Sequence, residues 1–475
     1  MSERPTSSIQ TGSPDPWGGL SQEVSTLISR VLPPFIGAGH SDLSGRVIVP
    51  LLDSSSGQPF AQVVQADLQD ADLAVAAALD VTQGEWGAYS ACERESLLYR
   101  FAELFDTNQQ PLAELESLAT GRAVTPVLRT CIPEALVWVR YLAGLPSTLE
   151  GHTAADQGSM DPFRCSFRDP RGTALLRVQC TESLTQRLVP VVSALSAGCP
   201  LVLICDDSAY PVLYFLCELL VRAGVPADAL CLLAGDAALE ERLLSHDDLF
   251  RPGVASAALP ESSPSADSSS RMLVFEDADI DQVVEVLLER VLSPLNPTIF
   301  TPRIHAHESL YEELIEAIAD RIDRLRCGPA LEQTTQLGPL CQPEQVLQAQ
   351  QVLARCRSLG LRVLGGEPFC DGRGLAPALI ADDPLRLAHE ALSLPVPVLM
   401  VQPFGYEDRT VRRANRDRNC RGISLFTQQL ARIRRLSRSL RTEQIWVNGH
   451  YRMEPGDRYD PLAPYLRRRT LWIES

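Results

Sequence analysis

The sequence predicts an α/β protein built from two doubly wound domains. Short continuous apolar runs, of which 201–204 is the clearest, alternate with segments of helical periodicity. Such runs are typical of strands that are buried on both faces of a parallel sheet. The alternation is interrupted at 252–270, where Pro, Ser and Ala predominate. We therefore expect one α/β domain on each side of a loop or linker.

The first part of the chain predicts helices. After a polar stretch over 1–33, which we expect to be a loosely ordered lead-in, residues 91–124 carry a helical pattern. Pro111 suits the first turn of a second helix within this stretch, and a third helix is expected over 135–141. One face of the first helix collects its apolar side chains, which are Leu97, Leu98, Phe101, Leu104 and Phe105.

Strands and helices then alternate on both sides of the linker. We expect the strand 201–204 to be followed by a helix over 210–223 and by a second buried strand over 229–233. Beyond the linker the same rules predict further elements, namely a strand over 272–275, helices over 280–292 and 310–326, and a strand over 445–447.

Charge and cysteine content exclude several classes of protein. The formal net charge of the 475 residues is −17, which disfavours partners such as nucleic acid or an anionic membrane. All 43 basic residues are arginine, so a reaction or cofactor contact that needs an ε-amine has no group to supply it.

The 13 cysteines contain no CxxC pair, and we expect neither a metal site nor a disulfide framework. No secretory signal or membrane-spanning run is evident, which predicts a cytoplasmic location.

Seven segments, in order, resemble motifs of the aldehyde dehydrogenase superfamily. The segments are GEWGAYSACERESLLYRFAELF, LESLATGRAV, YLAGLPSTLEGH, EDADID, LRCGPALEQTTQLGPL, IWVNGH and PYLRRRTLWIES. The resemblance runs from about Phe35 to Ser475. It implies two doubly wound α/β domains plus a β oligomerisation arm, and therefore a homo-oligomer or a hetero-oligomer with an active paralogue. The implied division is a cofactor-type Rossmann-like domain over 34–143 and 170–270, an arm over 144–169 and 451–475, and a catalytic-type domain over 271–450.

The residues that carry out catalysis in this family are missing at the matching positions. The family attacks the aldehyde with a cysteine thiolate, and alignment on Arg303 places Thr298 there. No cysteine lies between Cys231 and Cys327. Ser265 stands where the family has the glutamate that activates water, with Glu261 nearby as a shifted alternative.

The third catalytic position and the cofactor contacts also differ from the family. Thr181 takes the position of the asparagine that holds the oxyanion. The family's lysine for the adenosine ribose is replaced by Ile204 or Cys205, although Asp207 remains a candidate acceptor for a ribose hydroxyl. The pyrophosphate turn should fall at 253–258, where there is a single glycine.

A later contact completes the comparison. Ser393 replaces the glutamate that contacts the nicotinamide ribose, with Glu390 three residues upstream. If any cofactor binds, it is expected to be NAD or NADP.

The leading hypothesis is a scaffold or regulatory subunit that has lost catalysis. The segment LESLATGRAV and the missing residues resemble in particular the catalytically lapsed "family 16" type. The alternative is a residual enzyme. It would be either an unconventional NAD(P)-dependent aldehyde dehydrogenase or a nucleotide-binding hydrolase that reuses the cleft between the domains.

Three further features are assigned plain roles. His305 and His307 are expected on one strand face at the surface. Cys327 and Cys341 are expected to be packing residues, with a role as redox sensors as the alternative. The eleven arginines of 409–441 are expected to form a solvated or subunit-contacting face, with Leu430, Ile433, Leu436 and Leu440 on the buried side of a helix. A site for an acidic partner or a nucleotide phosphate is the alternative.

Overall fold

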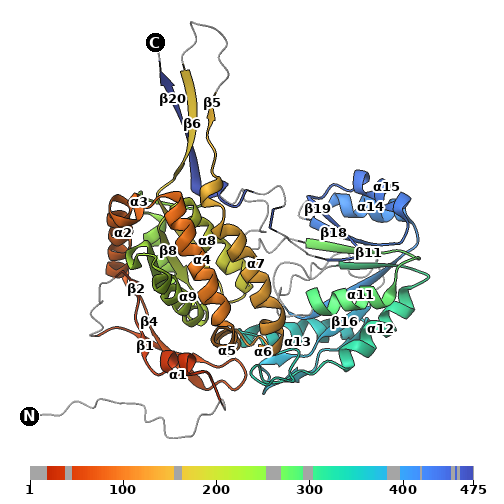
Figure 1. Cartoon of the computed structure of the whole chain (residues 1–475). Coiled ribbons are helices and arrows are strands. Elements are labelled where there is room, and N and C mark those ends of the chain that lie inside the picture. Colours follow the sequence, from red (N-terminus) through yellow and green to blue (C-terminus); the bar gives the residue numbers. More distant parts are fainter. Residues whose placement is uncertain are drawn as a thin grey trace, which may run out of the picture.

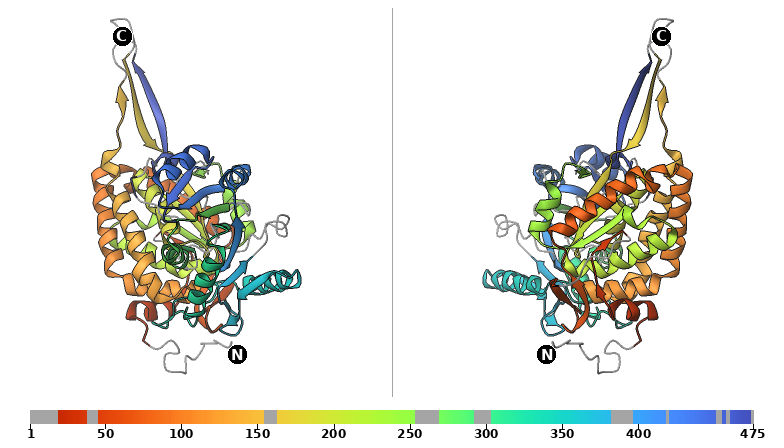
Figure 2. Two further views of the ribbon diagram at one scale, coloured as in Figure 1. Left: turned by 90° about the vertical axis from the view of Figure 1, so that its right-hand side faces the viewer. Right: turned by 90° about the vertical axis from the view of Figure 1, so that its left-hand side faces the viewer.

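The structure is a computed structural model that describes most of the chain. The described residues are 19–37, 45–153, 163–252, 269–291, 303–381, 396–417, 420–450, 455–456 and 460–473. Two α/β bodies lie side by side, and a narrow β arm projects from the first of them (Figure 1). Views from the two sides show the arm standing clear of both bodies (Figure 2).

The first body is centred on a five-stranded sheet. Strands β10, β7, β8 and β9 run parallel to one another, and β2 lies at one edge, antiparallel to β9. All five residues of both β8 and β9 are buried, as expected for strands covered on two faces. In sheet order the strands are β10 (Leu249–Phe250), β7 (Thr173–Val178), β8 (Leu201–Cys205), β9 (Leu230–Ala234) and β2 (Phe35–Ile36).

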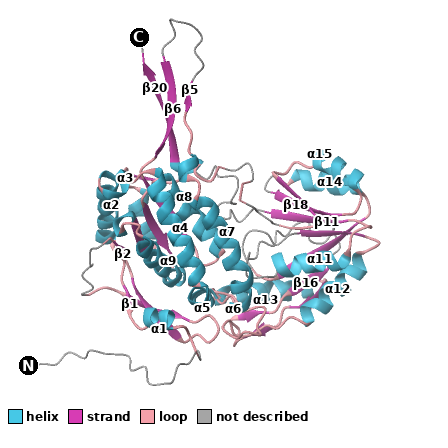
Figure 3. Ribbon diagram, in the orientation of Figure 1, coloured by secondary structure: helices cyan, strands magenta, loops and turns pink. Residues whose placement is uncertain are grey.

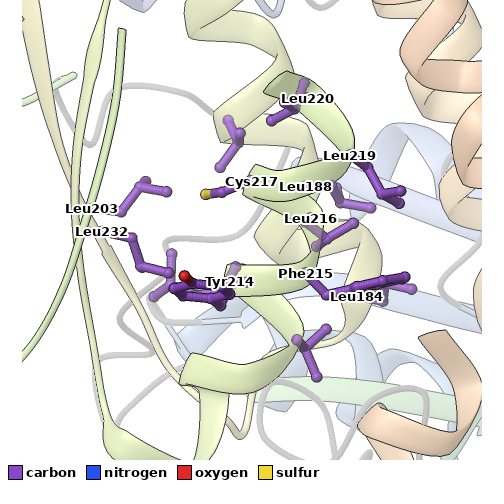
Figure 4. Close-up of a cluster of buried hydrophobic side chains, with 14 of the residues drawn as sticks. Leu184, Leu188, Leu203, Tyr214, Phe215, Leu216, Cys217, Leu219, Leu220 and Leu232 are labelled. Atoms are coloured by element: carbon purple, nitrogen blue, oxygen red, sulfur yellow. The ribbon is translucent and has the colours of Figure 1, made fainter. Parts of the chain in front are cut away.

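Helices cover both faces of this sheet. Leu203 and Leu232 pack against helices α8 and α9 on one face, while Val202 and Ile204 pack against α2 and α10 on the other. Figure 4 shows Cys217 of α9 facing Leu203 and Leu232. These four helices are α2 (Leu68–Gln83), α8 (Leu184–Ala197), α9 (Tyr210–Ala223) and α10 (Ala237–Leu244).

An outer helical layer and a small sheet complete the first body. The three longest outer helices pack on α8 and α9, and the small sheet has the order β1-β4-β3. The helices are α1 (Gln22–Ile28), α3 (Glu85–Ala88), α4 (Ala91–Thr107), α5 (Gln109–Thr120), α6 (Val124–Pro126) and α7 (Ile132–Ala143). The strands are β1 (Val31–Leu32), β3 (Ile48–Leu52) and β4 (Pro59–Val64).

The second body is centred on a seven-stranded sheet. Six strands are parallel, and β13 is antiparallel at one edge. In sheet order they are β13 (Arg362–Gly365), β16 (Ala378–Ala381), β17 (Val398–Phe404), β12 (Arg303–His307), β11 (Ser269–Val274), β18 (Cys420–Phe426) and β19 (Gln444–Val447). A separate hairpin pairs β14 (Pro368–Phe369) with β15 (Gly374–Leu375).

Helices again flank the sheet on both sides (Figure 3). Apolar side chains of α11 and α12 pack on one face, those of α14 and α15 pack on the other, and α13 covers the edge that contains β16. The helices are α11 (Ile280–Val286), α12 (Tyr311–Asp323), α13 (Pro343–Ser358), α14 (Glu407–Arg416) and α15 (Leu430–Ser439). A π-helical turn, Leu287–Val291, follows α11.

The arm is a three-stranded antiparallel sheet of order β20-β6-β5. Its strands are β5 (His152–Thr153), β6 (Phe163–Pro170) and β20 (Leu466–Ile473). The ladder between β6 and β20 runs from Pro170 opposite Leu466 to Phe163 opposite Ile473. The chain thus brings two segments that are far apart in sequence into one projecting ribbon.

Two parts of the sequence interpretation need correction. Residues 22–28 form α1, with Val24 and Leu27 buried one turn apart, so this stretch packs on the body rather than forming a loose lead-in. In α15, Leu430 is 60 % exposed whereas Arg432 is buried. The binary pattern failed there because Arg432 pairs with three acidic side chains, which offset part of the cost of burying it. The linker prediction for 252–270 falls mostly outside the described residues.

Candidate functional site

The candidate site lies where β7 and β8 end. Both strands are parallel and end at the same edge of the first sheet, β7 at Val178 and β8 at Cys205. In open α/β sheets ligands bind outside this carboxyl edge. Asp206 links the two loops there, since one carboxylate oxygen accepts from the Cys180 backbone N–H at 2.9 Å and the other from the Ala209 N–H at 3.0 Å.

A buried cluster of three charged side chains lies next to this edge. Glu116 of α5 accepts hydrogen bonds from Arg122 and from Arg187 of α8, and none of these three side chains is more than 5 % exposed. Gly121, at φ +78°, ends α5 in the left-handed conformation, which turns the chain so that Arg122 follows directly. Burial alone would raise the pKa of Glu116, but the charges of Arg187 and Arg122 hold it below its usual value.

Thr181 is fixed through its backbone. Its carbonyl oxygen accepts a hydrogen bond from Arg122 at 3.0 Å, so the loop that resembles the family's oxyanion position is tied to the ion cluster. The sequence therefore located this loop, but the group that the structure engages is the main chain of Thr181.

Glu182, the next residue, was missed in the sequence interpretation. Its side chain is 3 % exposed, and one carboxylate oxygen accepts from the Gln179 N–H at 3.0 Å. The other oxygen has no hydrogen-bond partner among the described residues. Burial raises the pKa of Glu182 to about 8, so the group is a proton carrier near neutral pH. An acidic residue in the short loop that follows a buried strand is the signal that could have identified it.

Two thiols meet at the same edge. The sulfur of Cys180 lies 3.1 Å from the sulfur of Cys341, which precedes α13. The segment before Cys341 approaches the first body closely, because a side chain on Gly338 would collide with the backbone oxygen of Gly121. Sequence separation gave no indication of this contact.

Comparison with known proteins identifies the family. The profile of the aldehyde dehydrogenase family matches residues 42–251 and 255–458. The chain belongs to the aldehyde dehydrogenase family. This confirms the resemblance and the predicted aldehyde-dehydrogenase-like α/β fold.

Individual relatives agree with this assignment. A dehydrogenase from Acinetobacter baylyi, named for (Z)-2-((N-methylformamido)methylene)-5-hydroxybutyrolactone, is 27 % identical over 437 residues, which cover 87 % of this chain and 87 % of that protein. An aldehyde dehydrogenase from Bacillus cereus, solved as its NAD+ complex, has a TM-score of 0.85 at 21 % identity and covers 96 % of this chain and 99 % of its own. HpcC from Thermus thermophilus has a TM-score of 0.82 at 22 % identity, with 95 % of each chain covered. At these identities the two structures establish the fold alone.

Asp207 lies at the sheet edge where the resemblance places a cofactor. Asp207 accepts a hydrogen bond from Gln65 at 2.5 Å, and burial raises the pKa of its carboxyl group. Ile204 and Cys205, which resemble the position of the family's lysine, are both buried in β8, Ile204 against α2 and α10 and Cys205 on the opposite face. Neither residue carries the amine that the resemblance places at this position.

Several predicted site residues cannot be placed. Thr298, Ser265 and Ser393 lie outside the described residues, as do Glu261 and Glu390. Of the predicted positions, the structure brings Thr181 and Asp207 to the same sheet edge, through neighbouring strands.

The two histidines of β12 differ in exposure, whereas the sequence analysis expected both at the surface. His305 is 4 % exposed, and its Nε2 accepts a hydrogen bond from Arg271 at 3.0 Å. Strand β12 is an inner strand of the sheet, and helices pack on both faces of that sheet, so a side chain at its centre is covered. Burial and the charge of Arg271 lower the pKa of His305 to about 3. His307, at the strand end, hydrogen-bonds to Ser309 at 2.8 Å.

The arginine-rich segment is partly neutralised by acids. Arg432 and Arg435 both pair with Glu407. A surface hollow of about 610 Å³ is lined by Tyr406 together with acidic residues and arginines. These charged residues are Glu407, Asp408, Arg409, Arg412 and Arg435. Mixed charge favours a solvated or subunit-contacting face over a phosphate site.

Two further findings concern the described part of the chain. Within those residues no helix is long and apolar enough to cross a membrane. The same residues contain no cluster of three or more His, Cys, Asp or Glu side chains that could hold a metal ion.

Proposed function

We propose that this aldehyde dehydrogenase family member has lost thiol-dependent aldehyde oxidation and acts as a scaffold or regulatory subunit. One observation carries the proposal. The chain has no cysteine between Cys231 and Cys327, and Thr298 aligns with the family's nucleophile. A threonine hydroxyl is a weak nucleophile unless a base activates it.

The thiols around the site support this reading. Burial raises the pKa of Cys131 to about 12 and raises the pKa of Cys205 well above its usual value. The pKa of Cys180 is also raised, by its hydrogen bond to Cys341 and by burial. Thiols that stay protonated are poor nucleophiles, so these three do not substitute for the missing one.

The activity test compares the wild-type protein with two variants at Thr298. We expect no NADH or NADPH production from a panel of aliphatic and aromatic aldehydes by the wild type or by Thr298→Ala. Thr298→Cys tests whether the rest of the site still supports the reaction. Steady turnover by the wild type that disappears in Thr298→Ala would contradict the proposal, since a contaminant would survive the substitution.

The arm is the surface proposed to carry assembly. Members of the family are commonly oligomeric. On this arm Phe167 is 45 % exposed and Leu471 46 % on one face of the ribbon, and Trp472 is 57 % exposed on the other face. Large apolar side chains gathered on a projecting sheet mark an interaction surface. We propose that this surface binds a second copy of the chain or an active paralogue.

Assembly can be tested without disturbing the bodies. Phe167 lies opposite Arg469, next to Leu471 on one face of the ribbon. The double variant Phe167→Asp with Leu471→Asp should reduce the mass measured by native mass spectrometry, in material from the native cells, to that of a single chain. Leu347→Asp is the control, because Leu347 is 59 % exposed on α13 of the second body. An unchanged assembly in the arm variant would rule out the arm.

A second candidate is an NAD(P)-dependent oxidoreductase with an unconventional site. It is favoured by the position of Asp207 at the carboxyl edge of β8, and by a dehydrogenase relative at 27 % identity. Calorimetric titration with NAD and NADP separates the two candidates. Micromolar binding that Asp207→Asn weakens supports this second candidate, and absence of binding supports the scaffold.

A further inference from the structure

The contact between Cys180 and Cys341 joins two distant parts of the chain. The residues are 161 positions apart, and their sulfur atoms are 3.1 Å apart. Cys180 lies between β7 of the first sheet and α8, and Cys341 lies just before α13, which packs on the second sheet. A bond between these sulfur atoms would therefore connect the parts of the chain that form the two bodies.

The chain around each cysteine is tied down near the contact. The N–H of Cys180 is bound by the Asp206 carboxylate. The segment leading to Cys341 is attached to the first body, where the Val124 N–H donates to the Ala330 carbonyl at 2.8 Å. The Ala330 N–H in turn donates to the Ser55 hydroxyl at 2.9 Å. A disulfide has a sulfur separation of about 2.05 Å, so an approach of about 1 Å would complete it.

We propose that Cys180 and Cys341 form a reversible disulfide that links the two bodies when a peroxide oxidises the protein. The Cys341 thiolate attacks one peroxide oxygen and becomes a sulfenic acid, and the first water leaves. The Cys180 thiol, held against the sulfenic sulfur, then attacks it and passes its proton to the departing hydroxide, which leaves as the second water. In sum, two thiols and one hydrogen peroxide give one disulfide and two waters. Two equivalents of an external thiol reverse the bond by exchange, and they become a disulfide in turn.

The two thiols differ in the way that this order of events requires. Cys341 is partly exposed whereas Cys180 is 2 % exposed, so a dissolved oxidant reaches Cys341 first. The hydrogen bond from Cys180 and the charge of Arg122 lower the pKa of Cys341. The thiolate is the form that reacts with peroxides. In a reducing compartment such pairs are typically redox-sensing rather than structural.

The decisive measurement is peptide mapping after oxidation. Wild-type protein is treated with hydrogen peroxide, its remaining thiols are alkylated, and it is cleaved after arginine. We expect peptide 178–187 joined to peptide 327–355. Because the second peptide also contains Cys327, a further cut after Glu332 assigns the bond to Cys341. The linked peptide should vanish after treatment with dithiothreitol.

Two variants make the result specific. Cys92→Ser removes an exposed thiol and should leave the linked peptide unchanged, whereas Cys341→Ser should abolish it. The thiol count of the oxidised wild type should be 11, two fewer than the 13 cysteines of the sequence. Failure of the linked peptide to form in folded wild-type protein, or a bond that uses Cys327 instead, would overturn the proposal.

Thermal unfolding provides an independent readout. A bond across 161 positions restricts the unfolded chain, so the oxidised wild type should unfold at a higher temperature than the reduced protein. Cys341→Ser, at a partly exposed position, should unfold at one temperature in both conditions. Equal unfolding temperatures for oxidised and reduced wild type would contradict a link between the bodies.

Discussion

Arg187 donates a hydrogen bond to Glu116, and both side chains are almost completely shielded from water, with exposures of 0 % and 1 %. Arg122 donates to the same carboxylate oxygen. Burying charge is costly, and a cluster of this kind tolerates the loss of a member poorly because the remaining charges are left uncompensated. The cluster therefore stabilises the loops at the ends of β7 and β8.

Glu116→Gln should lower the free energy of unfolding by about 3 to 5 kcal/mol, because two buried arginines lose their counter-charge. Urea unfolding measures this change. Asp320→Asn is the control, since the Asp320 and Arg324 side chains are 53 % and 70 % exposed and such pairs contribute about 0 to 1 kcal/mol. A Glu116→Gln effect as small as that of the control would show that the cluster is not stabilising.

Glu182→Gln should become increasingly more stable than the wild type as the pH rises from 5 to 8. The unfolded state loses the Glu182 proton near pH 4.5, whereas the folded state keeps it until about pH 8. Between these values the folded state binds more protons, so wild-type stability falls as the pH rises, by on the order of 1.4 kcal/mol per pH unit. The glutamine can still accept from Gln179. Unfolding curves at pH 5, 6, 7 and 8 measure the difference, and parallel pH profiles would contradict it.

His305→Gln should weaken the loss of stability in acid. The folded state keeps His305 neutral down to about pH 3, while the unfolded state binds a proton near pH 6.5. The contribution of this histidine is complete above pH 6.5 and is lost as the pH falls from 6.5 toward 3. The wild type should therefore lose more stability than His305→Gln over this range. His307→Gln, on the same strand, should keep the wild-type profile in thermal unfolding at each pH, and an identical response of the two variants would refute the assignment.

Arg432→Leu should destabilise the second body although leucine suits a buried helix position. The guanidinium group donates to Glu276, Asp277 and Glu407 and lies 4.5 Å from the centre of the Phe275 ring. Losing these charged hydrogen bonds should cost about 2 to 3 kcal/mol. Arg434→Leu, at an exposed position of the same helix, should change the unfolding free energy by less than about 0.5 kcal/mol. Similar values for both variants would contradict the role of Arg432.

The parts of the fold that depend on local pattern could be predicted from the sequence. The helix expected over 210–223 has those bounds in the structure, because Pro211 suits its first turn and Gly224 ends it at φ +104°. The strand expected over 201–204 extends by one residue to Cys205. Apolar periodicity and turn residues suffice for elements of this kind.

Contacts between distant residues could not be predicted in the same way. Periodicity treats arginine as an exposed residue, so it could not identify Arg432 or Arg187 as buried, since their acidic partners lie elsewhere in the chain. Thr181 was located by resemblance, but Glu182 beside it was not. Within LESLATGR, an acidic residue on an otherwise small and apolar helix, with an arginine six positions later, was the available indication of the Glu116 cluster.

The pairing of β6 with β20 also determines when the arm can form during synthesis. Ile473 lies opposite Phe163, so 473 − 163, or 310, residues separate the two ends of this ladder. Until the ribosome has delivered the late strand, β6 has only its short pairing with β5 at Ser166 and Cys165. An unpaired strand edge invites wrong partners in a nascent chain. Any association through the finished ribbon must therefore wait until the late strand has been made, and the earlier strand needs protection in the meantime.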